Sequence, residues 1–272
     1  MGKKAREQEG IMHVYFRANG RYTVFYDDED NLELLRRMDK YTKKHNSKVL
    51  EFALMGNHAH FLINTNCVTI LMKEVLQSYS RWYNKKYKNS NKVFKTPFSS
   101  ACKKSDEWVL HTALYILQNA VKAGLCSKIE NYRWSSAVLH FMDCKKHIPI
   151  GYLQYLNLCG AISVDTSFVD SLFKDYKEFL EYMNNCPIVK ANLVGSDSKW
   201  EYATTEQIVG AMNKLLGGRI LNQLSRNEMK DLILMLHRSI KCKMLQIASV
   251  LHVDYKFVKD CIKDIKEAPQ PE

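Results

Sequence analysis

His58 and His60 are the residues in this sequence best suited to hold a metal ion. They open an apolar run typical of a strand, in which successive side chains point to opposite faces. Both imidazoles therefore project from one face, about 6.6 Å apart along the backbone, while Ala59 and Phe61 can be buried on the other. Two neutral imidazoles on a rigid strand can bind a divalent metal ion. The triplet is common in proteins, so it indicates a ligand pair only together with other features.

A predicted helix over 106–123 carries a second group of reactive side chains. Its polar residues recur at helical spacing along one face, and they are His111, Tyr115, Gln118, Asn119 and Lys122. Leucine and valine side chains on the opposite face would anchor the helix in a core. The simpler interpretation is the solvent side of an amphipathic helix. Such a side usually carries Glu and Lys pairs, whereas this stripe offers a phenol, an amide and an imidazole.

The segments around these two groups predict an α+β fold built on an antiparallel sheet. The expected elements are a strand at 13–16, a short extended piece at 22–25, a helix at 27–45, a strand at 48–55, a tight turn at 56–57, the histidine strand and a helix at 69–87. Asp27 to Asp30 are expected to be the N-cap and first-turn acids of a helix, in preference to metal ligands. A packing turn is expected at 131–136, a connector at 148–160 and a helix at 167–183.

The C-terminal part predicts a set of short helices. One opens near Thr205 and ends at Gly217-Gly218, and another starts with a capping box at Ser225. The last two, at 244–251 and 254–262, have the small-residue pattern of a helix-turn-helix. Three residues of the second helix would then face a DNA groove, namely Tyr255, Lys256 and Lys259. A plain helical hairpin is the alternative.

The charge of the chain predicts an anionic partner. Its 272 residues include 40 Lys and Arg against 29 Asp and Glu, a net charge of +11, so nucleic acid, anionic lipid and acidic proteins are all candidates. From Arg81 to Lys104 there are eight basic residues and no acid, interleaved with aromatic residues. Basic side chains follow a phosphate backbone, and aromatic faces stack on unpaired bases. This favours nucleic acid, with a solvated lysine-rich loop as the alternative.

The composition is typical of a globular protein in a reducing compartment. Hydrophobic residues make up 46% and charged residues 25%, which predicts a sizeable core. We find no apolar run long enough to span a membrane, no signal segment after the basic N-terminus, and no myristoylation pattern after Gly2. The eight cysteines include no C-x-x-C pair, which argues against a zinc knuckle or a redox motif. We expect a cytoplasmic protein with no membrane partner.

Four blocks within about residues 10 to 140 resemble the single-tyrosine HUH transposases of bacterial insertion sequences. They are Asp27 to Asp30, Leu54-Met55-x-Asn57-His58-x-His60-Phe61-Leu62, Tyr115-Ile116-x-x-Asn119-x-Val121-x-Ala123-Gly124-Leu125 and Tyr132-x-Trp134-Ser135-Ser136. The chain is most similar to the longer REP-associated tyrosine transposases, some of which carry a comparable C-terminal extension. Leu117 and Ala120 stand where the family usually has His and Pro, and Lys95-Thr96-Pro97-Phe98 lacks its usual Arg. These departures remove no candidate catalytic group.

By position, the resemblance implies that His58, His60 and Asn119 are metal ligands and that Tyr115 is the nucleophile. One helical turn separates Tyr115 from Asn119, so both lie on one helix face. The implied cofactor is Mg²⁺ or Mn²⁺, which would polarise the scissile phosphate. Attack by the tyrosine would leave a 5′-phosphotyrosine and a free 3′-hydroxyl, and rejoining to another 3′ end would need no ATP.

The implied substrate is single-stranded DNA near a hairpin. Candidate contacts to it are Arg17, Arg21, Arg81, Lys85, Lys86, Lys95 and Lys122, while the C-terminal helices would contact duplex DNA. We expect a ferredoxin-like domain with helices on one face over 1–147, a helical connector over 148–200 and a helical DNA-binding domain over 201–272. A monomer or homodimer at the bacterial nucleoid is implied.

Three other functions remain open from the sequence. One is a domesticated DNA-binding protein that uses its C-terminal helices while the nuclease site is idle. Another is a metal-dependent hydrolase in which water attacks and Tyr115 only stacks on a base, which would leave no covalent adduct. An RNA binder of the RRM type is disfavoured because the exposed aromatic strand motif of that fold is missing.

Overall fold

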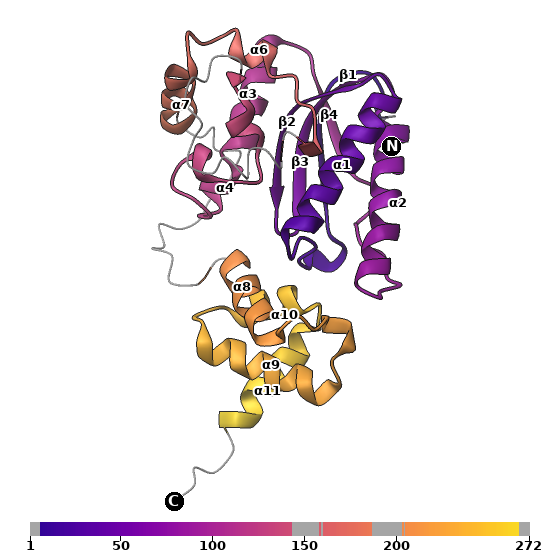
Figure 1. Cartoon of the computed structure of the whole chain (residues 1–272), viewed down its shortest axis with the longest axis vertical. Helices are drawn as coiled ribbons and strands as arrows, with labels where there is room; N and C mark the ends of the chain where they lie inside the picture. Colours follow the sequence, from indigo (N-terminus) through magenta and orange to yellow (C-terminus); the bar gives the residue numbers. More distant parts are fainter. Residues whose placement is uncertain (1–5, 143–157, 159, 187–202, 204, 267–272) are drawn as a thin grey trace, which may run out of the picture.

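A four-stranded antiparallel sheet is the centre of the computed structural model, which describes residues 6–142, 158, 160–186, 203 and 205–266. The strands are β1 (Gly10–Arg17), β2 (Lys48–Met55), β3 (His58–Thr65) and β4 (Ser99–Lys103), in the spatial order β2-β3-β1-β4. The helix α1 (Asp28–Lys44) joins β1 to β2, and α2 (Val68–Lys86) joins β3 to β4. This connectivity is the expected ferredoxin-like topology, with α1 and α2 side by side on one face (Figure 1).

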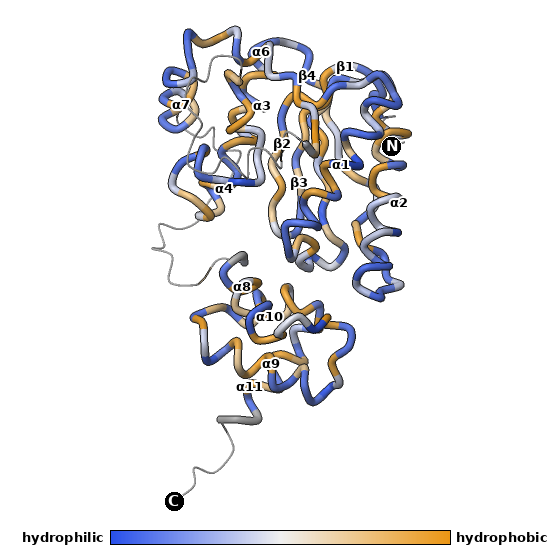
Figure 2. The backbone as a smooth tube through the Cα atoms, viewed as in Figure 1, coloured by the Kyte–Doolittle hydropathy of each residue, from blue (hydrophilic) through white to orange (hydrophobic). Residues whose placement is uncertain are grey.

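The histidine strand β3 is an interior strand. It pairs with β2 through the turn at Gly56-Asn57 and with β1 on its other edge. His58 lies opposite Arg17 of β1, and His60 lies opposite Tyr15. The alternate residues of β3 are fully buried under α1 and α2, along a sheet that is largely hydrophobic (Figure 2). Because hydrogen bonds hold β3 on both edges, the two imidazoles stand on a rigid base.

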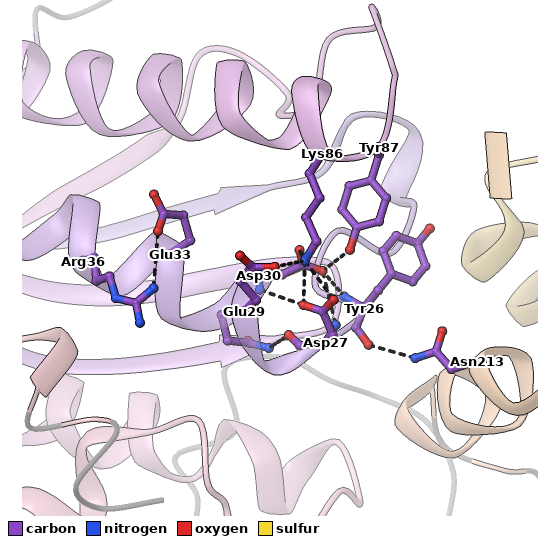
Figure 3. Close-up of polar contacts among 10 residues, drawn as sticks. Tyr26, Asp27, Glu29, Asp30, Glu33, Arg36, Lys86, Tyr87 and Asn213 are labelled. Atoms are coloured by element: carbon purple, nitrogen blue, oxygen red, sulfur yellow. Dashed lines mark hydrogen bonds and ion pairs between the residues drawn. The ribbon is translucent and has the colours of Figure 1, made fainter. Parts of the chain in front are cut away.

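The acidic start of α1 is a structural cap, as the sequence predicts. Asp27 accepts a hydrogen bond from the backbone N–H of Asp30 at 2.9 Å, and Asp30 accepts one from that of Asp27 at 3.2 Å. The Asp30 carboxylate is fully buried and also accepts from Lys86 Nζ and Tyr87 Oη, at 2.9 and 2.7 Å (Figure 3). Burial raises the pKa of Asp30 to about 6, against the opposing effect of Lys86.

Two strand predictions are wrong. β4 lies inside the basic segment expected to be a loop, and it pairs with β1. It is an edge strand without a buried residue, so it has no apolar alternation to reveal it. The extended piece 22–25 joins no sheet. Instead the N–H of Thr23 donates to the carbonyl of Ser249 at 3.0 Å, which ties the C-terminal helices to the sheet domain.

The helix α3 (Asp106–Leu117) packs on the sheet face opposite α1 and α2, so helices cover both faces and not the one face predicted. Its Val109 and Ile116 contact the apolar residues of β2 and β3. The predicted helix 106–123 is interrupted at Gln118 and resumes as α4 (Asn119–Lys122). Gln118 is 3% exposed and donates from Nε2 to the carbonyls of Met183 and Cys186, at 2.7 and 3.2 Å.

The back of α3 is supported by the described part of the connector. The predicted helix 167–183 is two helices, α6 (Ser167–Asp170) and α7 (Tyr176–Asn185), because Asp175 caps a new helix start. Apolar residues of both, including Phe179 and Met183, pack against the inner side of α3. The rest of the predicted connector, 148–157, 159 and 187–200, lies outside the described residues.

The turn predicted at 131–136 packs on β2 through two short 3₁₀ turns, η2 (Ile129–Asn131) and η3 (Ser136–Leu139). Tyr132 Oη donates to the carbonyl of Leu54 at 2.6 Å, and the N–H of Leu54 donates to the carbonyl of Trp134 at 2.8 Å. These bonds hold β2 at the end that leads into the histidine hairpin, so the turn supports the strand pair that carries His58 and His60.

Four helices occupy the C-terminal region as expected: α8 (Thr205–Leu216), α9 (Arg226–Ser239), α10 (Met244–Leu251) and α11 (Tyr255–Lys266). Ser225 caps α9 through the predicted capping box. The link between α10 and α11 turns at His252, which has a left-handed φ of 54°. This unit packs below the sheet domain in Figure 1, where Tyr26 Oη donates to the carbonyl of Val250 at 2.8 Å. Across the described ranges, none of the helices combines the length and the apolar character of a membrane span.

Candidate active site

The sheet face below α3 brings together the two reactive groups of the sequence. Tyr115 of α3 lies with its ring centroid 5.5 Å from that of His60 on β3. The His58 and His60 rings are 5.4 Å apart, as expected for alternate residues of one strand. Two residues of β1 complete the cluster, since His13 is 5.8 Å from Tyr115 and Tyr15 is 4.8 Å from His60. A phenol and an imidazole pair thus converge from distant parts of the chain.

Each candidate ligand histidine is held through its Nδ1 atom. The Nδ1 of His58 lies 2.7 Å from Oδ1 of Asn57, whose Nδ2 donates to the carbonyl of Arg21 and so fixes the amide orientation. His58 therefore donates from Nδ1 and keeps a lone pair on Nε2. The Nδ1 of His60 lies 3.0 Å from Nε2 of His13, and donation in that direction leaves Nε2 of His60 free in the same way. Both Nε2 atoms can then act as metal ligands.

Burial keeps these imidazoles neutral. It lowers the pKa of His58 to about 4, with a further contribution from the Arg17 charge, and that of His60 to about 2. The pKa of His13 is likewise lowered to about 4 by burial and by Lys103. A neutral imidazole is the form that binds a metal, so this donor set fits a divalent cation. No cluster of three or more His, Cys, Asp or Glu with metal-binding geometry is present in the described parts of the chain.

Asn119 and Lys122 flank the tyrosine from α4. The Nδ2 of Asn119 donates to the carbonyl of Tyr115 at 3.0 Å, which leaves its carbonyl oxygen as the group able to bind a metal. Lys122 Nζ lies 4.5 Å from the centroid of the Tyr115 ring. Burial raises the pKa of Tyr115, so its phenol is protonated at neutral pH and needs activation to act as a nucleophile.

The predicted DNA contacts fall into separate places. Arg17 ends β1 opposite His58, and its carbonyl accepts from the N–H of the exposed Lys95 at 2.9 Å. Arg81 and Lys85 are exposed on α2, which lies on the far side of the sheet from α3. Of these residues, Arg17 lies opposite His58 and Lys122 lies beside the Tyr115 ring, while Lys95 is linked to the site only through its backbone contact with Arg17.

The remaining basic residues differ in exposure and in whether a carboxylate neutralises their charge. Arg21 is exposed in η1 (Asn19–Arg21) at the edge of the domain. Lys86 is paired with three carboxylates of the α1 cap, those of Asp27, Glu29 and Asp30, at 2.8 to 3.0 Å. Its charge is thus balanced inside the fold. The three C-terminal candidates, Tyr255, Lys256 and Lys259, are all exposed on α11.

The prediction that the aromatic residues of 81–104 stack on bases is wrong for three of them, while Trp82 is half-buried and stays untested. Tyr83, Phe94 and Phe98 are 3%, 3% and 8% exposed and belong to the core between α2 and the sheet. Tyr87 is half-buried, and its Oη donates to Asp30. These rings pack in the core and are not available to stack on bases, because burial of a large aromatic side chain is strongly favourable.

The sequence prediction missed His13 and Tyr15 in this cluster. They alternate on one strand at the same spacing as His58 and His60, and this spacing was the available signal. Their use required the register of β1 against β3, which places Tyr15 opposite His60. Asn57 was recognised as a turn residue, but its contact with His58 was not anticipated.

Comparison with known proteins gives one family match and one similar solved structure. Residues 8–101 match the family model described as "Transposase IS200 like", a range that includes His58 and His60 and ends before Tyr115. A solved structure of a REP-associated tyrosine transposase bound to a REP hairpin is 13% identical, with a TM-score of 0.45, over 50% of this chain and 82% of that one. The curated proteins provide no match. The family match thus agrees with the resemblance noted in the sequence over residues 8–101 and does not extend to the rest of the chain.

Proposed function

We propose, from the match of residues 8–101 to the IS200-like transposase family model, that this chain cleaves single-stranded DNA and transfers the cut end through Tyr115. The observation that carries the proposal is the 5.5 Å approach of the Tyr115 ring to His60. A nucleophile and a phosphate-activating group must meet at one phosphate, and this pair is close enough to do so. Tyr115 lies beyond the family match, so its role rests on this geometry and on its spacing from Asn119.

The reaction follows from the groups around the phenol. Tyr115 Oη attacks the phosphorus and loses its proton, while the bond from phosphorus to the 3′-oxygen breaks and that oxygen takes up a proton. The product is a 5′-phosphotyrosine and a free 3′-hydroxyl, which conserves the phosphodiester for transfer to another 3′ end. The Lys122 ammonium beside the ring favours the negative charge that develops on Oη.

The candidate cofactor is Mg²⁺ or Mn²⁺. His58 and His60 would hold it through Nε2, and Asn119 through its amide oxygen. When bound, such an ion supplies positive charge at the non-bridging oxygens of the scissile phosphate. The hydrogen bonds that His58 and His60 donate from Nδ1 to Asn57 and His13 support this assignment because they leave the lone pair of each Nε2 available for a metal ion.

The proposed substrate is single-stranded DNA beside a hairpin, bound by a monomer or a homodimer. Arg17 and Lys122 are the best candidates for phosphate contacts because Arg17 lies opposite His58 and Lys122 lies beside the tyrosine ring, with the exposed Lys95 joined to Arg17 by one backbone hydrogen bond. The exposed face of α11 is the proposed contact to duplex DNA, as the second helix of a helix-turn-helix. We place the catalytic domain at 1–147 and the DNA-binding extension at 201–272, and the site of action at the bacterial nucleoid.

The test uses the purified protein, Mn²⁺ and labelled single-stranded hairpins that flank its own gene. Denaturing gels report a covalent protein–DNA adduct, which Tyr115→Phe should abolish while leaving DNA binding nearly unchanged. Tyr15→Phe is the matched control, since Tyr15 contacts the same histidines from β1. Cleavage without an adduct would favour the hydrolase, in which water attacks. Tight binding without cleavage, with unrelated and double-stranded DNA also tried, would favour a non-catalytic DNA-binding protein.

A further inference from the structure

A cavity of about 250 Å³ opens beside Tyr115, on the side towards β4. Its wall includes His13, Lys103, Trp108, His111 and Lys122, together with the tyrosine itself. All of its lining residues belong to the described part of the chain, and none of them is acidic. Two lysines without a carboxylate among the lining residues make the cavity suitable for an anionic ligand.

Trp108 provides an exposed aromatic face at the rim of this cavity. It is 60% exposed and lies in the first turn of α3, directly before the buried Val109. Lys103 Nζ lies 6.0 Å from its ring centroid, and the His111 ring is 6.3 Å away in an edge-on orientation. Proteins that bind single-stranded nucleic acid stack unpaired bases on exposed aromatic rings and bind the adjacent phosphates with nearby cations.

Gln118 gives an independent indication of a ligand. It lines the cavity, it is 3% exposed, and its Nε2 donates to two carbonyls of the α7 region. These two bonds fix the amide orientation, and they leave Oε1 buried with no hydrogen-bond partner in the described structure. An unsatisfied buried acceptor is costly, and a ligand N–H group that reached Oε1 from the cavity would relieve that cost. The edge of a nucleobase carries such groups.

We propose that this cavity binds one unpaired nucleobase of the DNA strand, stacked on Trp108, next to the phosphate that Tyr115 attacks. The proposal rests on the proposed function for its substrate class and adds a specific base-binding site. Lys103 and Lys122 would contact the flanking phosphates. The base in the cavity would fix the position of the strand relative to the phenol, so it would contribute to the choice of the cleavage position.

The test measures equilibrium binding of a short single strand of mixed sequence in EDTA, so that cleavage does not interfere. A strand of equal length with abasic residues throughout is the second ligand. Binding of the first strand should quench the fluorescence of Trp108, and the abasic strand should bind more weakly with no such quenching. Trp108→Ala should weaken binding of the mixed strand about 5- to 150-fold, and Trp108→Phe should restore most of it.

Two matched controls separate stacking from general effects. Ile70→Ala removes another exposed apolar side chain, on α2, and should bind like the unchanged protein. Lys104→Gln removes the same charge as Lys103→Gln one residue along the chain, where the lysine pairs with Glu7, and should have the smaller effect. Equal affinity of Trp108→Ala and the unchanged protein would overturn the proposal, as would equal affinity for the two strands.

The covalent adduct assay distinguishes this failure from failure of the proposed function. If the protein forms the adduct and Trp108→Ala binds DNA as tightly as the unchanged protein, the nuclease function is supported and the base-binding site is ruled out. If base-dependent quenching is seen but no adduct forms, the base-binding site is supported and the nucleophilic role of Tyr115 is ruled out. The first result contradicts the proposal, and the second supports it.

Discussion

Replacing His140 with Gln should remove a large part of the pH dependence of folding stability, because His140 is a buried imidazolium between two carboxylates. Its Nε2 lies 3.0 Å from Glu51 Oε1, and its Nδ1 lies 2.6 Å from Asp170 Oδ1. His140 and Glu51 are fully buried, and Ser136 Oγ donates to the second oxygen of Glu51 at 2.5 Å. The network ties the loop after the packing turn to β2, the strand beside the histidine strand.

The magnitude follows from the pKa of the imidazole. Burial lowers it, but the charges of Glu51 and Asp170 outweigh burial and raise the pKa of His140 from 6.5 to about 9. That rise corresponds to about 3 kcal/mol of folding free energy. Because the folded pKa is the higher one, this contribution is complete below about pH 6.5 and is lost as the pH rises through about 9.

Urea denaturation of both proteins between about pH 6 and pH 10 measures this contribution. The free energy of unfolding of the unchanged protein should fall by about 3 kcal/mol more than that of His140→Gln over this range. His237→Gln, which changes an exposed imidazole on α9, is the control and should follow the unchanged protein. Parallel curves for the unchanged protein and His140→Gln would refute the reasoning.

Two further predictions concern the cap of α1 and the proposed metal ligands. Lys86→Met should lower the free energy of unfolding by about 3 kcal/mol in urea denaturation, because it leaves a buried carboxylate without its cation, whereas the exposed Lys85→Met should change it little. His13→Ala should weaken Mn²⁺ binding about 10- to 100-fold in calorimetry, since it removes the partner of His60 Nδ1. His111→Ala, in the same cavity wall, should bind Mn²⁺ normally, and equal losses in both variants would contradict the orienting role.

Local signals predicted the elements that carry them. The strand 48–55 was predicted with the bounds that the structure gives, because an apolar run ends at a Gly-Asn turn. The capping residues Asp27 and Ser225 located two helix starts correctly. By contrast, β4 has no buried residue, and Asp175 was a capping signal that the continuous amphipathic pattern of 167–183 concealed.

The candidate site was predictable only where its members are a few residues apart in the sequence. Spacing on one strand identified His58 and His60, and helical spacing placed Tyr115 and Asn119 together. Contacts between strands, or between α3 and α7, join residues far apart in the sequence, so local spacing does not predict them. For this reason Tyr15 was missed, and Gln118, which appeared to belong to a reactive stripe, is held by the carbonyls of α7. Composition likewise does not reveal whether an aromatic residue beside lysines is exposed or buried.

The central claim is that Tyr115 forms the covalent bond to DNA. Its most direct test is mass spectrometry of the adduct, trimmed with nuclease and digested with protease, to locate the nucleotide-bearing peptide. We expect the 5′-phosphate on Tyr115, the phenol of α3 that faces His60. A nucleotide on Tyr15, whose ring is 4.8 Å from the same histidine, would contradict the account. Cut DNA without any modified peptide would contradict it as well.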